Sequence, residues 1–195
     1  MDNITFEQIA GRADCLRKID RENNFSFIKS YFHFVGYFSK RDEITEHDLV
    51  IGANFTYGWM PTILNFKSRD FELSVEILNK VKNDLRITSD EIKHLKQLIN
   101  NSLVGVSKLL HFLSPFVYAM WDSRVCKFLT GKSYKQKVEN INLFLSYLNL
   151  CARIVEDPRF APIHEDHIRR IGYEISPMRT IEQIMFLSSD KPIVT

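Results

Sequence analysis

The spacing of apolar residues most constrains the fold of this chain, because nearly every long segment repeats them at a helical period. In the segment 25–38 they stand three or four positions apart: Phe25, Ile28, Phe32, Val35 and Phe38. Such spacing places the side chains on one face of a helix. No segment alternates as a strand does, and only FVYAMW, residues 116–121, is ambiguous. We therefore predict an all-α protein, a compact bundle of about nine or ten helices.

Capping residues predict where several of these helices begin. Thr45 and Asp48 form a variant capping box ahead of an apolar helix. Ser176 is a good N-cap, and Pro177 takes the first helical position, where proline is favoured. Pro61 is expected to kink or restart the helix that begins near Thr45.

Length and composition bound the domain organisation. A chain of 195 residues can bury a substantial core, and only 7 glycines and 6 prolines argue against long loops. We predict a single helical domain over residues 1–195. It has possible sub-lobes at 1–86 and 87–187 and a frayed tail at 188–195.

Charge, cysteines and hydropathy exclude several protein classes. The net charge of +2 is mild for a nucleic-acid-binding protein, although a local basic patch remains open. Cys15, Cys126 and Cys151 are far apart, which argues against a disulfide scaffold or a cysteine zinc site. Neither a signal peptide nor an apolar run long enough to span a membrane is found. We expect a cytoplasmic protein that does not associate with membranes, and we favour a monomer.

Motifs of the common phosphate-binding and hydrolytic folds are absent, including GxxxxGK[ST], GxGxxG, GxSxG and HExxH. His164-Glu165-Asp166-His167 places two histidines three residues apart, beside carboxylates, which a metal site could use. The same four residues also suit the acidic start of a helix over 165–175. Since no other His or Cys pair clusters nearby in the sequence, we favour the helix start and predict neither a metal nor a cofactor.

Three further features each have a binding and a structural interpretation. The C-terminal arginines could bind phosphate, or could pair locally with Glu156, Asp157 and Glu165: Arg153, Arg159, Arg169, Arg170 and Arg179. Lysines around Gly131 could also contact phosphate: Lys127, Lys132, Lys135 and Lys137. The bend YGWMP, residues 57–61, could be a stacking surface for a base or a site of helix–helix packing.

The segment 107–125, SKLLHFLSPFVYAMWDSRV, carries a lysine and an aspartate near the two ends of an apolar passage. A helix over 92–98, the break INNSLVGVS and the helix SKLLHFL precede Asp122, which can cap SRVCKFL. This arrangement resembles the helix-hairpin-helix DNA glycosylase superfamily, and within it the 8-oxoguanine glycosylase branch. The phrases KLLHFLSP and WDSRV also resemble small bacterial proteins, a likeness that implies no function.

The resemblance implies a glycosylase that excises a damaged or modified base flipped out of double-stranded DNA, in repair or in phage defence. In that family the lysine displaces the base and the aspartate stabilises the positive charge on the sugar, roles that fall here to Lys108 and Asp122. The implied contacts to the substrate are Tyr57, Trp59, His111, Trp121 and Arg124. The implied contacts to the DNA backbone are Gly105, Ser107, Lys127 and Lys132.

The hairpin also differs from the family pattern. The family carries two glycines that flank an apolar residue, whereas here Gly105 alone stands between Val104 and Val106. The alternative hypothesis is therefore a helical module that binds nucleic acid or a protein without catalysis. In the structural interpretation, Lys108 is an exposed residue of the first turn of its helix and Asp122 caps the next helix.

Overall fold

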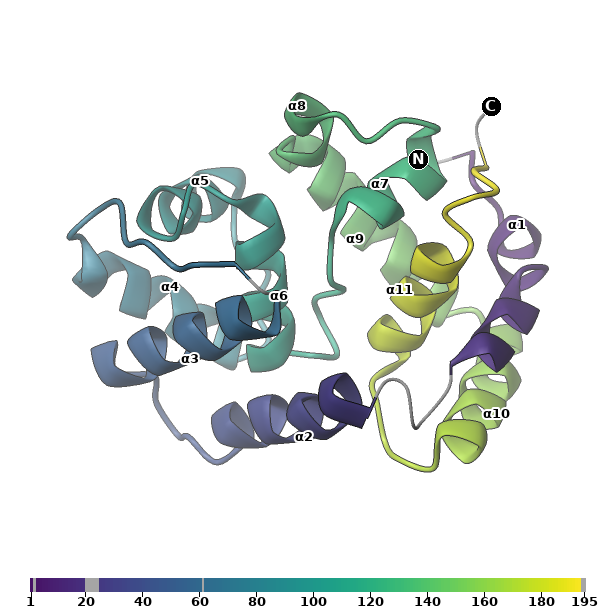
Figure 1. Ribbon diagram of the computed structural model, residues 1–195, viewed down its shortest axis with the longest axis horizontal. Coiled ribbons are helices and arrows are strands. Elements are labelled where there is room, and N and C mark those ends of the chain that lie inside the picture. Colours follow the sequence, from purple (N-terminus) through teal and green to yellow (C-terminus); the bar gives the residue numbers. More distant parts are fainter. Residues whose placement is uncertain (2, 20–24, 61, 194–195) are drawn as a thin grey trace. The chain divides into compact units, whose positions relative to one another are not determined.

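The computed structural model describes residues 1, 3–19, 25–60 and 62–193 (Figure 1). These residues form eleven α-helices and two 3-10 helices. Within that part of the chain, the only β pairing is an isolated bridge between Phe66 and Ile99. The prediction of an all-α protein is confirmed. More helices form than expected, because those of only four or five residues are too short to show a period in the sequence.

The helices group into two compact units. Unit 2 is Phe25–Tyr118, and unit 1 is Met1–Asn24 together with Ala119–Thr195. Unit 2 contains α2 Phe25–Ser39, α3 Glu46–Trp59, α4 Phe71–Lys82, α5 Ser89–Leu98 and α6 Leu103–Leu113. Unit 1 contains α1 Phe6–Ala10, η1 Ala13–Lys18, α7 Ser123–Thr130, α8 Lys135–Val138, α9 Ile141–Val155, η2 Pro158–Phe160, α10 Ala161–Ile171 and α11 Pro177–Leu187.

Helix α6 is the centre of unit 2 and packs against α2, α3, α4 and α5 (Figure 1). It can do so because its sequence, LVGVSKLLHFL, is apolar on nearly every side, as in a helix surrounded by others. The two units therefore differ from the possible sub-lobes 1–86 and 87–187. A boundary near residue 86 would separate α5 and α6 from the helices on which they pack.

The two capping predictions are confirmed. Thr45 and Asp48 form the capping box at the start of α3, and the Ser176 side chain accepts a hydrogen bond from the Arg179 amide. Burial alone would raise the pKa of the Asp48 carboxyl. Hydrogen bonds from Thr45 and from Tyr37 Oη, at 2.7 Å, nevertheless hold that pKa below its usual value. Helix α3 ends at Trp59, and Pro61 lies outside the described residues.

Two predictions about the C-terminal third are wrong. Helix α10 begins at Ala161, with a proline in its first turn, so residues 164–167 lie within the helix and do not form its acidic start. The tail is docked through Ile193, whose amide donates to the Phe128 carbonyl at 2.8 Å, and Ser189 is buried. Residues 194–195 lie outside the described part.

Among the described helices, none combines the length and the apolar character needed to cross a membrane.

Candidate functional site

Lys108 and Trp59 form the centre of the candidate site in unit 2. Lys108 lies in the middle of α6 rather than in its first turn, and its side chain is half-buried. Its Nζ lies 5.5 Å from the centroid of the Trp59 ring, over the face of the indole. Phe27 and Phe112 stand edge-on to that ring, at centroid distances of 5.8 and 5.3 Å. We call these four residues the aromatic–lysine cluster.

Local sequence explains how the cluster is placed. Ser102 caps α6, its Oγ accepting from the Gly105 amide at 3.2 Å, and so fixes where the helix starts. From that start, Lys108 and Phe112 fall four residues apart on one face. Trp59 is the last residue of α3, which packs on α6, so its ring reaches the same face.

A helix, a short turn and a helix are present as α5, residues 99–102 and α6, but α6 begins at Leu103, so most of the predicted break INNSLVGVS belongs to the helix. The turn is formed by asparagines rather than glycines: Asn100 and Asn101 have φ values of 54° and 51°. Asparagine tolerates this left-handed backbone better than most residues. Asn100 also stabilises the turn, since its Nδ2 donates to the Ile63 carbonyl at 2.8 Å.

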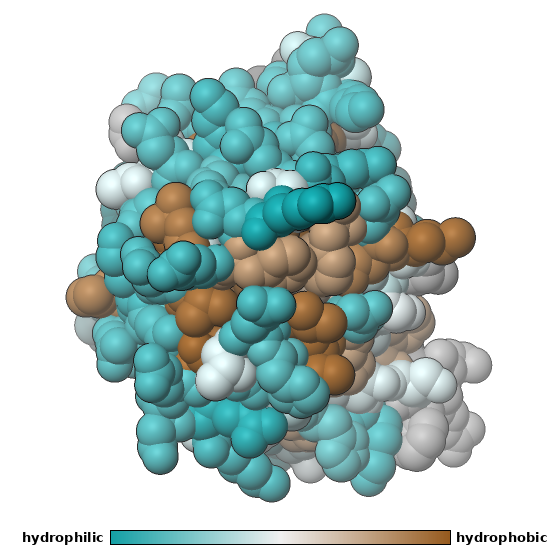
Figure 2. Space-filling model, turned by 90° about the vertical axis from the view of Figure 1, so that its left-hand side faces the viewer, coloured by the Kyte–Doolittle hydropathy of each residue, from teal (hydrophilic) through white to brown (hydrophobic). Residues whose placement is uncertain are grey.

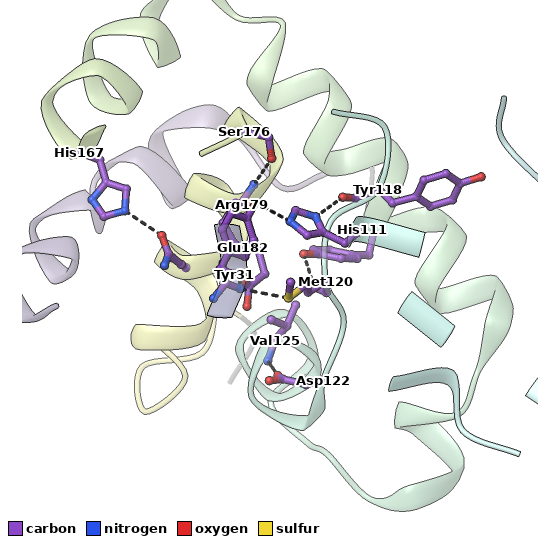
Figure 3. Close-up of polar contacts among 12 residues, drawn as sticks. Tyr31, His111, Tyr118, Met120, Asp122, Val125, His167, Ser176, Arg179 and Glu182 are labelled. Carbon is purple, nitrogen blue, oxygen red and sulfur yellow. Dashed lines mark hydrogen bonds and ion pairs between the residues drawn. The ribbon is translucent and has the colours of Figure 1, made fainter. Parts of the chain in front are cut away.

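Asp122 belongs to unit 1, where it caps α7 as the sequence predicted. Its Oδ1 accepts hydrogen bonds from the amides of Arg124 and Val125, both at 2.9 Å; Figure 3 shows Asp122 beside Val125. The carboxylate is half-buried, and neither capping bond uses Oδ2. A carboxylate fixed by its own helix is therefore present, whatever further role it has.

Three residues implied as DNA or base contacts are buried inside unit 2. The Tyr57 ring is 2% exposed, and its Oη donates to the Ile99 carbonyl at 3.3 Å. Gly105 lies against that ring, since a Cβ on it would come within 2.4 Å of Tyr57 Oη. Ser107 is fully buried and donates to the Val104 carbonyl. Tyr57 therefore serves helix–helix packing. Gly105 and Ser107 are not accessible to a DNA phosphate.

His111 and Trp121 are also core residues rather than surface contacts. His111 Nδ1 lies 2.6 Å from the Tyr118 carbonyl and so carries the proton, which leaves Nε2 to accept from Tyr31 Oη at 3.0 Å (Figure 3). In unit 1, Trp121 is fully buried and its Nε1 donates to the Val138 carbonyl at 2.7 Å. Burial on all sides removes both rings from contact with a substrate.

The remaining predicted contacts lie at the surface of unit 1. Arg124 is exposed, with its guanidinium over the Phe186 ring at 4.6 Å. Lys127 pairs with Asp190 at 3.7 Å, and Lys132 is exposed just after α7. These three cations remain accessible to a phosphate backbone.

The C-terminal arginines form local ion pairs, as the favoured interpretation predicted, although most of the acidic partners differ. Their guanidiniums pair as follows: Arg159 with Asp157 and Glu7, Arg169 and Arg170 with Asp166, and Arg179 with Glu182. Hydrogen bonds from Arg159 lower the pKa of Asp157 to about 2. Arg153 instead donates to the Ile4 carbonyl at 2.7 Å.

The two histidines of the HEDH segment join α10 to α11. His164 Nδ1 lies 2.8 Å from Thr180 Oγ1. His167 Nε2 lies 2.7 Å from Gln183 Oε1, a contact drawn as a dashed line from His167 in Figure 3. Across the described residues, no three His, Cys, Asp or Glu side chains gather in a way that could hold a metal ion. The segment therefore serves helix packing in unit 1.

Comparisons with protein-family models, with curated proteins and with solved structures gave no match for this chain. The residues and their geometry therefore carry any functional assignment.

Phe27 is the member of the cluster that sequence reasoning did not connect with the site. In the sequence it is one of many phenylalanines in an apolar helix, and nothing there distinguishes it from a core residue. Its ring is 50% exposed beside Trp59, which makes it a candidate for contact with a ligand.

Unfolding should become easier in mildly acidic solution because of the two histidines on α10. Burial lowers the pKa of His164 and of His167 below the usual 6.5. The unfolded chain therefore binds protons more readily than the folded one, and the free energy of unfolding falls as pH drops below about 6.5. Urea titrations between about pH 7.5 and about pH 5 will measure this decrease.

A His164→Gln/His167→Gln variant is the control for this effect. It should be less stable at neutral pH but lose less of its remaining stability on acidification. An unchanged pH dependence in that variant would assign the effect to other groups.

Proposed function

We propose that this protein is a DNA glycosylase that removes a damaged or modified base, and that the aromatic–lysine cluster receives the base. The observation that carries the proposal is the Lys108 ammonium held over the half-buried Trp59 ring, beside the exposed Phe27. Accessible rings stack on bases of any sequence, and a cation beside them attracts the nucleic-acid backbone.

In the proposed reaction, the Lys108 amine attacks C1′ of the sugar and the glycosidic bond breaks, its electron pair leaving with the base. The family resemblance assigns to Asp122, in unit 1, the role of stabilising the positive charge that develops on the sugar. Attack requires the neutral form of the amine, so in the proposed reaction the ammonium first gives its proton to solvent.

Contacts to the DNA backbone in the proposal come from cations at the surface of unit 1, the exposed Arg124 and Lys132 and the half-exposed Lys127. The buried Gly105 and Ser107 are not part of the proposal. Each phosphate contact should make the slope of log affinity against log salt concentration more negative by about 0.9.

Borohydride trapping on duplexes with an abasic site, together with excision assays on modified bases including those of phage DNA, tests the role of Lys108. The wild-type protein should form a covalent adduct and excise at least one base. Lys108→Arg should do neither, since it keeps a cation near Trp59 but cannot form a Schiff base. Lys93→Ala, which removes an exposed lysine from α5, is the matched control and should behave as wild type. Excision that survives Lys108→Arg would refute the nucleophile.

Asp122→Asn tests the carboxylate without disturbing the fold, because asparagine caps a helix about as well as aspartate. Loss of the negative charge is expected to lower turnover by about 100-fold or more while DNA affinity is kept. Turnover equal to wild type would remove Asp122 from the mechanism.

A second candidate function, a non-catalytic module that binds a protein, is favoured by the surface of unit 2. Figure 2 shows apolar side chains gathered on one face and bordered by hydrophilic ones. Among the side chains of unit 2 that the structure describes, the large apolar ones that are exposed are Phe27, Phe32, Ile51, Ile63, Leu73, Leu85 and Phe116. Contiguous exposed apolar patches often mark protein interaction sites. Absence of excision, with duplex binding that is weak and insensitive to salt, would favour this function over the glycosylase.

A further inference from the structure

A short segment of unit 1, residues 132–137, leads from α7 into α8 and has the sequence KSYKQK (Figure 1). All of its residues are exposed except Lys137, which is half-exposed. Tyr134 is 56% exposed, and Lys137 Nζ lies 5.9 Å from the centroid of its ring. We call Lys132, Tyr134, Lys135 and Lys137 the tyrosine–lysine segment.

Both ends of the segment are fixed to the rest of unit 1. At its start, the Lys132 carbonyl accepts from Thr130 Oγ1 at 2.8 Å and lies 3.4 Å from Cys126 Sγ. Just after its end, the Val138 carbonyl accepts from Nε1 of the buried Trp121 at 2.7 Å. A segment held at both ends has little conformational freedom left to lose when a ligand binds, which favours affinity.

Positive charge dominates this part of the chain. From residue 123 to residue 138 the sequence carries Arg124, Lys127 and the lysines of the segment but no aspartate or glutamate. Across the described residues, none of the segment's lysines forms an ion pair, whereas Lys127 pairs with Asp190 at 3.7 Å. Clustered exposed cations of this kind attract an anionic partner.

The tyrosine distinguishes among anionic partners. The segment has no aliphatic residue to insert into a bilayer, and its three lysines are fewer than a lipid-binding cluster usually carries. In a duplex, both faces of each base are covered by neighbouring pairs. An unpaired base can instead stack on an accessible ring, while cations beside the ring contact the phosphates. The chemistry of the segment therefore fits a single strand better than a duplex or a membrane.

We propose that the tyrosine–lysine segment binds single-stranded nucleic acid, with an unpaired base stacked on Tyr134 and the neighbouring phosphates contacted by its lysines. The inference goes beyond the proposed glycosylase, because it involves unit 1 alone and requires no chemistry at Lys108. Lys132 is shared with the proposed contacts to duplex DNA, so the experiment compares single strands with a duplex.

Fluorescence anisotropy of the full chain with labelled oligothymidylate and oligouridylate of about ten nucleotides tests the proposal. The comparisons are an undamaged DNA duplex of the same length and sedimented vesicles of equal parts phosphatidylcholine and phosphatidylserine. At least one strand should bind more tightly than the duplex, and the stronger of the two distinguishes DNA from RNA. A duplex bound as tightly as either strand, vesicles bound in the absence of strand binding, or no binding at all would overturn the proposal.

Variants of the segment locate the binding. Tyr134→Leu keeps an apolar side chain but removes the stacking face, and should weaken strand binding about tenfold, whereas Tyr134→Phe should bind as wild type. Lys132→Gln/Lys135→Gln should make the slope of log affinity against log salt concentration less negative by about 1.4, since each contact to a single strand contributes about 0.7. Lys18→Gln, which removes an exposed lysine from η1, is the matched control and should leave that slope unchanged.

Lys108→Arg separates this proposal from the proposed glycosylase. It should abolish excision and leave the affinity for single strands at the wild-type value, so failure of one proposal does not imply failure of the other. If Lys108→Arg weakened strand binding as much as Tyr134→Leu, the strand would lie at the aromatic–lysine cluster instead. That result, or strand binding unchanged in Tyr134→Leu, would refute the site.

Discussion

Replacing Trp121 with alanine is expected to lower the free energy of unfolding by about 3–5 kcal/mol, the range for removing a large buried aromatic side chain. The indole is fully buried and lies near the rings of Phe144 and Tyr147, at centroid distances of 6.3 and 5.2 Å. Its Nε1 also satisfies the Val138 carbonyl, which loses its donor in the variant. A cavity and an unsatisfied acceptor therefore arise together.

Urea denaturation followed by circular dichroism will measure this effect. Trp121→Phe keeps part of the packing but not the hydrogen bond, and should lie between alanine and wild type. If Trp121 were instead a surface contact for substrate, alanine would reduce activity and leave the free energy of unfolding unchanged. That result would contradict its assignment to the core.

Replacing Gly105 with alanine is expected to destabilise the protein by roughly 1–3 kcal/mol, since overpacking a tight core forces side chains from their positions. The new Cβ would lie 2.4 Å from Tyr57 Oη and 2.8 Å from two ring carbons. Tyr57 is itself buried, so its ring has little space into which it can move. The result would establish that Gly105 serves helix packing.

Two comparisons separate this clash from the general effect of glycine in a helix. Gly58→Ala, at an exposed position of α3 with nothing within 4 Å of a new Cβ, should stabilise by about 0.5–1 kcal/mol. In a Tyr57→Leu background, Gly105→Ala should be much less harmful, because the obstructing ring is gone. Strictly additive effects of Gly105→Ala and Tyr57→Leu would rule out the proposed contact.

Helical periodicity in the sequence predicted the all-α fold, and local chemistry predicted the helix starts at Thr45, Asp122 and Ser176. A cap depends on a side chain and on amides two or three residues away, so neighbouring residues determine it. The start of α10 was predicted wrongly, because the acidic residues 165–166 are equally compatible with the interior of an exposed helix. Helix α10 instead follows directly on η2, with Phe160 as its N-cap. No motif in the sequence marks this earlier start.

In the candidate site, too, the sequence predicted some features and the tertiary structure decided others. Lys108 and Trp59 were singled out in the sequence, and the structure brings them together, whereas Tyr57, only two residues from Trp59, points into the core. Aromatic residues so close in sequence have similar composition and context. Only the direction in which α3 packs on α6 determines which ring is buried.

The sequence by itself therefore determined the secondary structure and most of the caps, because those depend on period and on contacts a few residues apart. The tertiary structure decided which aromatic and titratable side chains are accessible and which helices form each unit. Those properties depend on residues far apart in the chain that come together, such as Gly105 against Tyr57, or Leu16 and Ile163 in the lining of one cavity. Such contacts arise only when helices pack, so no local pattern of residues specifies them.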